Sequence, residues 1–377
     1  MATKAGITNP FSITSYMGKE YFCDREAETN QLREALYNRR NITLVSPRRM
    51  GKTGLIRHLF EQISPKEAYC FYIDIYNTSN LCDFTRVFAE AVLTKQLTPF
   101  SERVWKEMTR FFGSLRPVLS ADPITGMPQC SVEIQPDNAE MTLSQLFSYL
   151  EHANKRCYVA FDEFQTIADY PEGKAEATLR TYIQHLNNVN FIFAGSKKHV
   201  MLQMFSSVGR PFYQSTQLMS IGAIGEDAYF SFAASHLKAH KQTITKETFH
   251  DLYSLVSGHT WYVQVLLNRL YQSGIKDIDY AVVLLVLNQI LEEQIPVYQT
   301  YMHLLTDKQT AVMRAIAKEG IVHEPGSSKF LQKHTLGAYS TVRSVILSLA
   351  EKELLYIEED GSYSVYDRFW AIWLKNN

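Results

Sequence analysis

Residues 42–53 read ITLVSPRRMGKT, and this stretch decides the fold. A short apolar run at 42–45 leads into a loop with two arginines, and apolar residues then recur at helical spacing. The loop, 46–53, fits the pattern GxxxxGK[ST] except that Ser46 stands at the first glycine position. A strand, such a loop and a helix in that order form the context of a phosphate-binding loop. We therefore predict that this loop binds the phosphates of a nucleotide.

The residue types of the loop suit phosphate chemistry. Backbone N–H groups at a helix N-terminus attract negative charge, Lys52 supplies a positive charge for the β and γ oxygens, and the Thr53 hydroxyl suits Mg²⁺. The expected nucleotide contacts in this segment are Ser46, Pro47, Arg48, Arg49, Met50, Gly51, Lys52, Thr53 and Gly54. A serine at position 46 would be strained if the loop needed positive φ there. A chance GKT at a helix start is the alternative.

Further short apolar runs alternate with helical periodicity as far as residue 225. The strand candidates are 42–45, 70–75, 157–161 and 191–194, with 218–224 as a candidate fifth. This alternation predicts an α/β fold, a P-loop NTPase parallel sheet with helices on both faces. Residues 116–136 are rich in proline and break the pattern, which indicates a loop or an insertion with a small hairpin.

Two carboxylates, Asp162 and Glu163, follow the strand candidate 157–161. Parallel strands present their carboxyl ends at one sheet edge, so these side chains should lie near the phosphate loop. We expect Asp162 to hold Mg²⁺ together with Thr53, and Glu163 to activate the attacking water as general base. An acidic helix N-terminus is the alternative. Ser196, after the next strand candidate, would lie beside the γ-phosphate or be an ordinary turn serine.

Strand patterns end near residue 225, and helical patterns dominate residues 226–303. Residues 304–377 then give helix, helix and a hairpin around a Glu-Glu-Asp-Gly turn, which is typical of a winged helix. We predict a P-loop ATPase core at 1–225, a helical lid subdomain at 226–303 and a winged-helix domain at 304–377. Basic and acidic residues balance from 306 onward, which favours an intramolecular or protein-binding role over DNA binding. We expect a protein partner or self-association.

Composition excludes several classes of protein. Lys plus Arg is 38 and Asp plus Glu is 39, so no overall charge drives the chain to nucleic acid or an anionic membrane. The five cysteines are widely spaced without a CxxC, which argues against a disulfide framework or a zinc site. The longest apolar run, 280–287, is far shorter than the roughly 20 residues of a membrane helix. We expect a cytoplasmic protein with no membrane partner.

Together these residues resemble the AAA-related P-loop ATPases of the archaeal type, which are related to the STAND signalling NTPases. The segments that carry the resemblance are FCDREAE at 22–28, PRRMGKT at 47–53, FDEF at 161–164, GS at 195–196 and GRPFY at 209–213. The resemblance implies an ATPase core with a catalytic glutamate, a helical lid and a C-terminal winged helix. It also implies that residues 24–28, which include Arg25, line the adenine pocket and that Arg210 is a sensor or an arginine finger. A surface or capping arginine is the alternative for Arg210.

The combined prediction is an ATP-binding and ATP-hydrolysing switch whose nucleotide state controls the lid and the winged helix. ATP or ADP and Mg²⁺ are the expected cofactors, the expected catalytic residues are Glu163, Lys52 and Arg210, and turnover could depend on an activator. One alternative is a DNA-binding regulator or DNA-processing factor that uses ATP as a ligand. Another is a protein-interaction scaffold with a structural nucleotide, although the intact Lys52, Thr53, Asp162 and Glu163 set argues against it.

Overall fold

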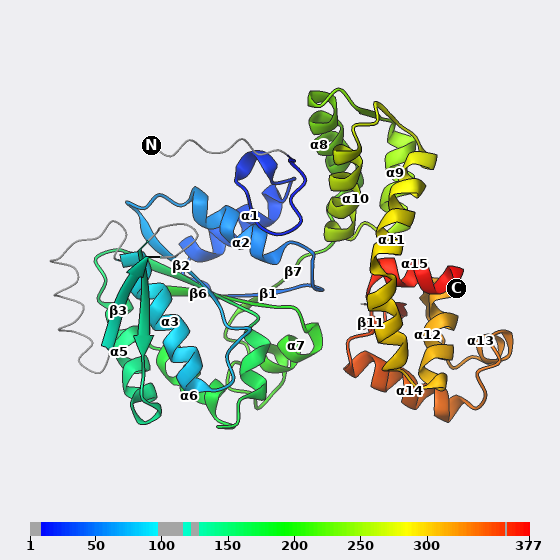
Figure 1. The fold of residues 1–377 in the computed structure, drawn as a ribbon. Coiled ribbons are helices and arrows are strands. Elements are labelled where there is room, and N and C mark those ends of the chain that lie inside the picture. Colours follow the sequence, from blue (N-terminus) through cyan, green and yellow to red (C-terminus); the bar gives the residue numbers. More distant parts are fainter. Residues whose placement is uncertain (1–8, 97–115, 122–127, 359) are drawn as a thin grey trace. The chain divides into compact units, whose positions relative to one another are not determined.

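A computed structural model describes residues 9–96, 116–121, 128–358 and 360–377 of the chain (Figure 1). The chain divides into two compact units. One unit consists of residues 14–224, and the other combines the N-terminal residues up to 13 with residues 225–377.

The unit 14–224 is built on a five-stranded parallel sheet with the strand order β2-β5-β6-β1-β7. Its strands are β1 (Ile42–Val45), β2 (Ala68–Asp74), β5 (Arg156–Asp162), β6 (Val189–Gly195) and β7 (Gln217–Ser220). Strand β1 is an interior strand, because it pairs with β6 on one side and with the edge strand β7 on the other. The predicted parallel P-loop sheet is confirmed. Because all its strands are parallel, their carboxyl ends lie at one edge of the sheet.

Helices cover both faces of this sheet, as the sequence predicts (Figure 1). Helices α1 (Glu26–Tyr37) and α2 (Lys52–Gln62) lie on one face, and α3 (Leu81–Gln96), α5 (Ala139–Glu151), α6 (Ala175–Ile183) and α7 (Lys198–Ser206) lie on the other. Along β5 the side chains alternate, so Tyr158 and Ala160 join the first layer while Val159 and Phe161 join the second. Burial on both faces explains why β5 is apolar throughout its length.

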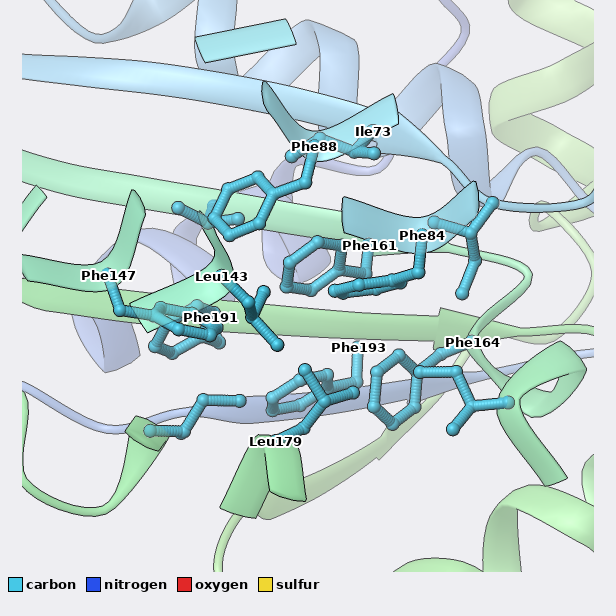
Figure 2. Packing of buried hydrophobic residues seen from close by; sticks show 14 of the residues in the cluster. Ile73, Phe84, Phe88, Leu143, Phe147, Phe161, Phe164, Leu179, Phe191 and Phe193 are labelled. Atoms are coloured by element: carbon cyan, nitrogen blue, oxygen red, sulfur yellow. The ribbon is translucent and has the colours of Figure 1, made fainter. Parts of the chain in front are cut away.

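A cluster of phenylalanines fills the second layer (Figure 2). The ring centroid of Phe161 lies 5.1 Å from that of Phe84 on α3 and 6.1 Å from that of Phe191 on β6. These rings are fully buried, and large buried aromatic side chains dominate core energetics. Because Phe161 immediately precedes Asp162, this packing fixes the position of the acidic strand end.

The insertion after α3 contains the predicted hairpin. Strands β3 (Arg116–Ala121) and β4 (Pro128–Glu133) pair antiparallel, with Arg116 opposite Glu133. Residues 122–127, between these two strands, lie outside the described residues. A short 3₁₀ helix, Pro136–Asn138, then leads into α5.

The second unit begins with four helices. They are α8 (Glu226–Ala239), α9 (Lys246–Leu255), α10 (Thr260–Ser273) and α11 (Tyr280–His303). Two short strands, β8 (Thr243–Ile244) and β9 (Asp277–Ile278), pair in parallel between them. Residues 9–13 pack here too, with the buried Phe11 ring against Phe232 and Tyr271 and the Asn268 side chain donating to the Phe11 carbonyl at 2.7 Å.

The winged helix of the same unit has more elements than its sequence suggests. It contains α12 (Asp307–Glu319), β10 (Ile321–Val322), α13 (Ser328–Lys333), α14 (Tyr339–Glu351), β11 (Leu355–Ile357), β12 (Tyr363–Val365) and α15 (Arg368–Asn376). Thr306 caps α12 in a capping box with Gln309. Strand β10 and helix α13 were not predicted, because they are too short to show a period.

Helix α11 is longer than the apolar run 280–287 indicated. Within the described part of the chain it is the helix with the length and composition of a membrane span, and 28% of its most apolar window is buried. One such helix is weak evidence for a membrane segment, because core helices pass the same test. Here α11 packs against α15, where the Tyr301 and Trp370 ring centroids lie 5.3 Å apart.

Candidate nucleotide-binding site

The phosphate loop joins the end of β1 to the start of α2. Two residues of the loop, Arg49 (φ 68°) and Gly51 (φ 93°), have a left-handed backbone conformation. A Cβ at Gly51 would meet open space, so the backbone angle rather than crowding favours glycine there. Ser46 is not at a left-handed position, so the strain considered for a serine at the first motif position does not arise.

Lys52, the first residue of α2, is buried within the loop with 5% of its surface exposed. Its Nζ donates to the Ser46 carbonyl at 3.2 Å, the Ser46 hydroxyl at 3.3 Å and the Pro47 carbonyl at 3.3 Å. Burial lowers the pKa of Lys52, while the charges of Glu163 and Asp162 oppose that shift. The loop thus holds a desolvated cation. Anionic phosphate oxygens that reach Lys52 would interact strongly with its charge.

The Asp162 carboxylate, at the end of β5, accepts hydrogen bonds from three directions. Its Oδ2 accepts from Thr53 Oγ1 at 2.6 Å and from the Tyr72 hydroxyl at 2.7 Å, and its Oδ1 accepts from the Glu163 N–H at 3.0 Å. The first contact brings together the two residues predicted to hold Mg²⁺. Burial and the charge of Asp162 raise the pKa of Tyr72, so this phenol stays a donor.

Thr53 and Asp162 provide the ligand type that Mg²⁺ prefers. Both present oxygen atoms, and Mg²⁺ in nucleotide sites takes one or two carboxylates together with waters and substrate phosphates. Within the described residues, no group of three or more His, Cys, Asp or Glu side chains could hold a metal ion. The donor set therefore fits a magnesium ion completed by phosphate oxygens better than a metal held by the protein alone.

Glu163 follows with a left-handed backbone (φ 57°), and two donors hold its carboxylate. Oε2 accepts from Gln165 Nε2 at 2.5 Å and from Ser196 Oγ at 2.7 Å. Ser196 was predicted near this edge, whereas Gln165 was not predicted. A Cβ on Gly195 would lie 2.6 Å from Gln165 Oε1 and 2.5 Å from Met201, so glycine is needed for this close approach.

A cavity of about 480 Å³ is lined in part by Gln165, the residue that donates to Glu163. Its lining residues are Arg48, Tyr76, Asn77, Thr78, Ser79, Gln165, Thr166, Asp169 and Lys197. Arg48 connects the cavity to the site, because its Nε donates to Ser196 Oγ at 3.4 Å. The cavity is thus linked to the Glu163 carboxylate through two of its lining residues, Gln165 directly and Arg48 by way of Ser196.

Arg25 is 4% exposed and braces the phosphate loop. Its guanidinium donates to the Gly222 carbonyl at 2.6 Å, the Met50 carbonyl at 3.3 Å and Glu28 Oε1 at 2.7 Å. These bonds connect the residue before Gly51 to the segment that follows β7. The adenine contact implied by the resemblance stays a prediction, while the bracing contacts were not anticipated. Gly54, another expected contact, lies against Phe22, whose ring would be 3.3 Å from a Cβ there.

Arg210 pairs with Glu176 on α6 in the same unit. The Glu176 carboxylate is largely buried, and burial raises its pKa while Arg210 opposes the rise. A buried carboxylate needs such a partner. The structure therefore gives Arg210 an intramolecular role, and its part as sensor or arginine finger stays a prediction.

A family model for an ATPase domain predominantly from Archaea matches residues 22–266. The chain belongs to this family. A model for a probable winged helix domain matches residues 296–376. The predicted archaeal-type ATPase with a C-terminal winged helix is confirmed, while the narrower AAA and STAND assignments stay predictions.

Known relatives agree with this assignment. An uncharacterized ATP-binding protein of Methanocaldococcus jannaschii is 22% identical over 273 residues, which are 68% of this ATPase and 72% of that protein. A Walker-type ATPase of Pyrococcus abyssi has a TM-score of 0.65 at 17% identity, over 97% of this chain and 99% of that one. The ORC2 protein of Aeropyrum pernix, solved in ADPNP and ADP complexes, has a TM-score of 0.59 at 14% identity, over 97% and 95%. These structural similarities show a shared fold.

Proposed function

We propose that this archaeal-type ATPase is a Mg²⁺-dependent nucleotide switch that binds ATP at the phosphate loop and hydrolyses it with Glu163. The observation that carries the proposal is the contact of Thr53 with Asp162, beside a buried Lys52 and a carboxylate at Glu163. A lysine, a hydroxyl, a metal-binding carboxylate and a second carboxylate are the parts that phosphoryl transfer to water requires. All four meet at the carboxyl edge of the sheet.

In this mechanism Lys52 leaves the loop carbonyls for the β and γ oxygens of ATP and neutralises their charge. Thr53 and Asp162 would hold Mg²⁺, which supplies further positive charge to the phosphates when bound. Glu163 accepts a proton from the attacking water. Gln165 and Ser196 bind Oε2 of Glu163, so Oε1 is the oxygen that would accept this proton.

We further propose that basal turnover is slow and that a partner protein or a second copy of the chain accelerates it. Gln165 and Ser196 both donate to Oε2 of Glu163, and Gln165 lines the 480 Å³ cavity. A partner residue that enters the cavity and binds Gln165 would remove one of these hydrogen bonds and let the glutamate turn toward the attacking water.

The switch would act on the lid, 226–303, and the winged helix, 304–377, together. The aromatic residues of α15 pack on helices of the lid range, where the Phe369 ring centroid lies 4.9 Å from that of Tyr262 and the Trp370 centroid 5.3 Å from that of Tyr301. Trp370 is 1% exposed. Such burial favours movement of the two parts as one body, driven by their different contacts with ATP and ADP.

ATP turnover with Mg²⁺ by the wild type and by Glu163→Gln tests the proposal, with exposed Glu140→Gln as the matched control. We expect Glu163→Gln to bind a fluorescent ATP analogue normally while its turnover falls by about two orders of magnitude. Lys52→Ala should lose binding itself. Equal turnover in Glu163→Gln and the wild type would refute the assignment of the base.

Two other functions from the sequence remain alternatives. DNA binding through the winged helix would require Arg343 on α14, so salt-dependent DNA binding lost in Arg343→Ala would favour it. A scaffold with a structural nucleotide would retain ADP and show no turnover with any partner. The cytoplasmic location remains a prediction of the sequence.

A further inference from the structure

We propose that Tyr72 is a positioning residue that orients the Asp162 carboxylate toward a magnesium ion. The inference rests on the proposed function, because it assigns Asp162 to Mg²⁺. Tyr72 lies on β2, and its hydroxyl donates to Asp162 Oδ2 at 2.7 Å. It belongs to none of the sequence motifs that point to the nucleotide site.

The hydrogen-bond capacity of Asp162 determines which of its acceptor positions remains for a metal ion. A carboxylate has about four acceptor positions, two on each oxygen. Thr53 and Tyr72 occupy both positions of Oδ2, and the Glu163 N–H occupies one position of Oδ1. The remaining position is on Oδ1, so the carboxylate presents one defined acceptor to the ion or to a water bound to it.

Without the Tyr72 hydroxyl, the hydroxyl of Thr53 would be the one remaining side-chain donor to Oδ2 among the residues that the structure describes. Thr53 is itself a proposed ligand of the ion, so its position must meet the demands of the metal. Tyr72 has no such second task, and it holds the carboxylate plane while Thr53 adjusts. Partners that orient metal-binding groups in this way typically change metal affinity by 10- to 100-fold when removed.

Two elements hold Tyr72 in place. Strand β2 pairs with β5 in parallel, so that Tyr72 lies opposite Ala160, two residues before Asp162. The Arg57 guanidinium on α2 lies 4.5 Å from the centroid of the Tyr72 ring, which is a cation–π contact. Arg57 is four residues after Thr53 and therefore on the same face of the helix. The helix that carries Lys52 and Thr53 thus also clamps the residue that orients Asp162.

The test uses Tyr72→Phe, which keeps the ring and removes the hydroxyl. Tyr69→Phe is the matched control, because Tyr69 lies on the same strand and its hydroxyl donates to Asn154, at 3.1 Å. Each purified full-length protein is loaded with ADP and titrated with Mn²⁺, and free Mn²⁺ is measured by electron paramagnetic resonance. ADP binding in EDTA is measured separately with a fluorescent analogue.

We expect Tyr72→Phe to bind Mn²⁺ about tenfold more weakly in its ADP complex, with ADP affinity in EDTA unchanged. Arg57→Leu should weaken Mn²⁺ binding about threefold through loss of the cation–π contact. Tyr69→Phe should match the wild type in both measurements. This pattern separates an effect on the metal from a general loss of folding.

Two results would overturn the inference. One is Mn²⁺ affinity in Tyr72→Phe equal to that of the wild type. The other is an equal loss of ADP affinity in EDTA, because Tyr72 would then support the phosphate loop and not the metal site. If the wild type itself binds no Mn²⁺ with ADP, the proposed Mg²⁺ site fails before Tyr72 is in question. The two failures are therefore distinguishable.

Discussion

Replacement of Arg25 by alanine should destabilise the unit 14–224 even without nucleotide. The guanidinium is 4% exposed and binds the Gly222 and Met50 carbonyls. An adenine-contacting arginine would instead affect nucleotide affinity and leave the stability of the free protein intact. Stability without nucleotide therefore distinguishes the bracing role from the role implied by the family resemblance.

The expected loss follows from the contacts. A hydrogen bond to a charged group contributes about 1.5–3 kcal/mol, and the 3.3 Å bond to Met50 belongs at the lower end. The pair with Glu28, whose side chain is 25% exposed, adds less than about 1 kcal/mol. We expect Arg25→Ala to lower the free energy of unfolding by about 3–4 kcal/mol.

The backbone at Arg25 supplies a matched control. Its φ is 69°, and a left-handed conformation costs a non-glycine residue about 1 kcal/mol or more. Arg25→Gly removes the same contacts but relieves this strain, so it should be about 1 kcal/mol more stable than Arg25→Ala. A variant pair that differs only in its backbone preference thus tests the left-handed conformation itself.

Urea unfolding followed by circular dichroism without nucleotide measures both variants, and hydrogen exchange at the α2 amides assigns the loss to the phosphate loop. ATP affinity should also fall, because Met50 directly precedes Gly51. The reasoning is refuted if Arg25→Ala unfolds like the wild type and loses only its preference for ATP over GTP.

Two further predictions concern residues that hold a carboxylate. Gln165→Met should raise basal ATP turnover several-fold at unchanged ATP affinity, because Glu163 loses one of the two hydrogen bonds that hold Oε2 and can turn toward the attacking water. Steady-state turnover checks this, and a fall in turnover would show that Gln165 orients the base instead. Arg210→Ala should destabilise the protein by about 1–2 kcal/mol near pH 8 and by less near pH 5 in urea unfolding. Burial raises the pKa of Glu176, so the folded state takes up a proton more readily and stability falls as pH rises through that pKa. Glu176→Gln in the Arg210→Ala background should restore stability, and a loss that is equal at both pH values would contradict the account.

The sequence predicts the central sheet well because buried parallel strands are short apolar runs whose polar residues follow their ends. Strand β1 has the predicted bounds, and the predicted strand at 157–161 appears as β5. Asp162 and Glu163 could be assigned to the site because parallel strands end at one edge. That assignment did not require the order of the strands in the sheet.

The residues that orient these groups could not be predicted in the same way. Tyr72 and Asp162 are 90 positions apart, and Arg25 and Gly222 are 197 apart. Each contact depends on which strands are neighbours and on their register, and neither is encoded in a local pattern. Gln165 offers one local signal, because it lies two residues after Glu163, although an amide at that spacing has many other uses.

The site contains a buried cation and two adjacent carboxylates, and polar groups of the surrounding residues stabilise both. The phosphate loop must keep Lys52 buried, and the strand end must keep Asp162 and Glu163 close together. Loop carbonyls satisfy the cation, while hydroxyl, amide and backbone N–H donors satisfy the carboxylates. When phosphates and a metal ion arrive, Lys52 exchanges its loop carbonyls for phosphate oxygens, whereas the donors to the carboxylates remain. The carboxylates therefore need little reorganisation, which is the condition for strong electrostatic stabilisation of a transition state. Variants of the orienting residues, Tyr72 and Gln165, should therefore alter metal affinity and turnover more than nucleotide affinity.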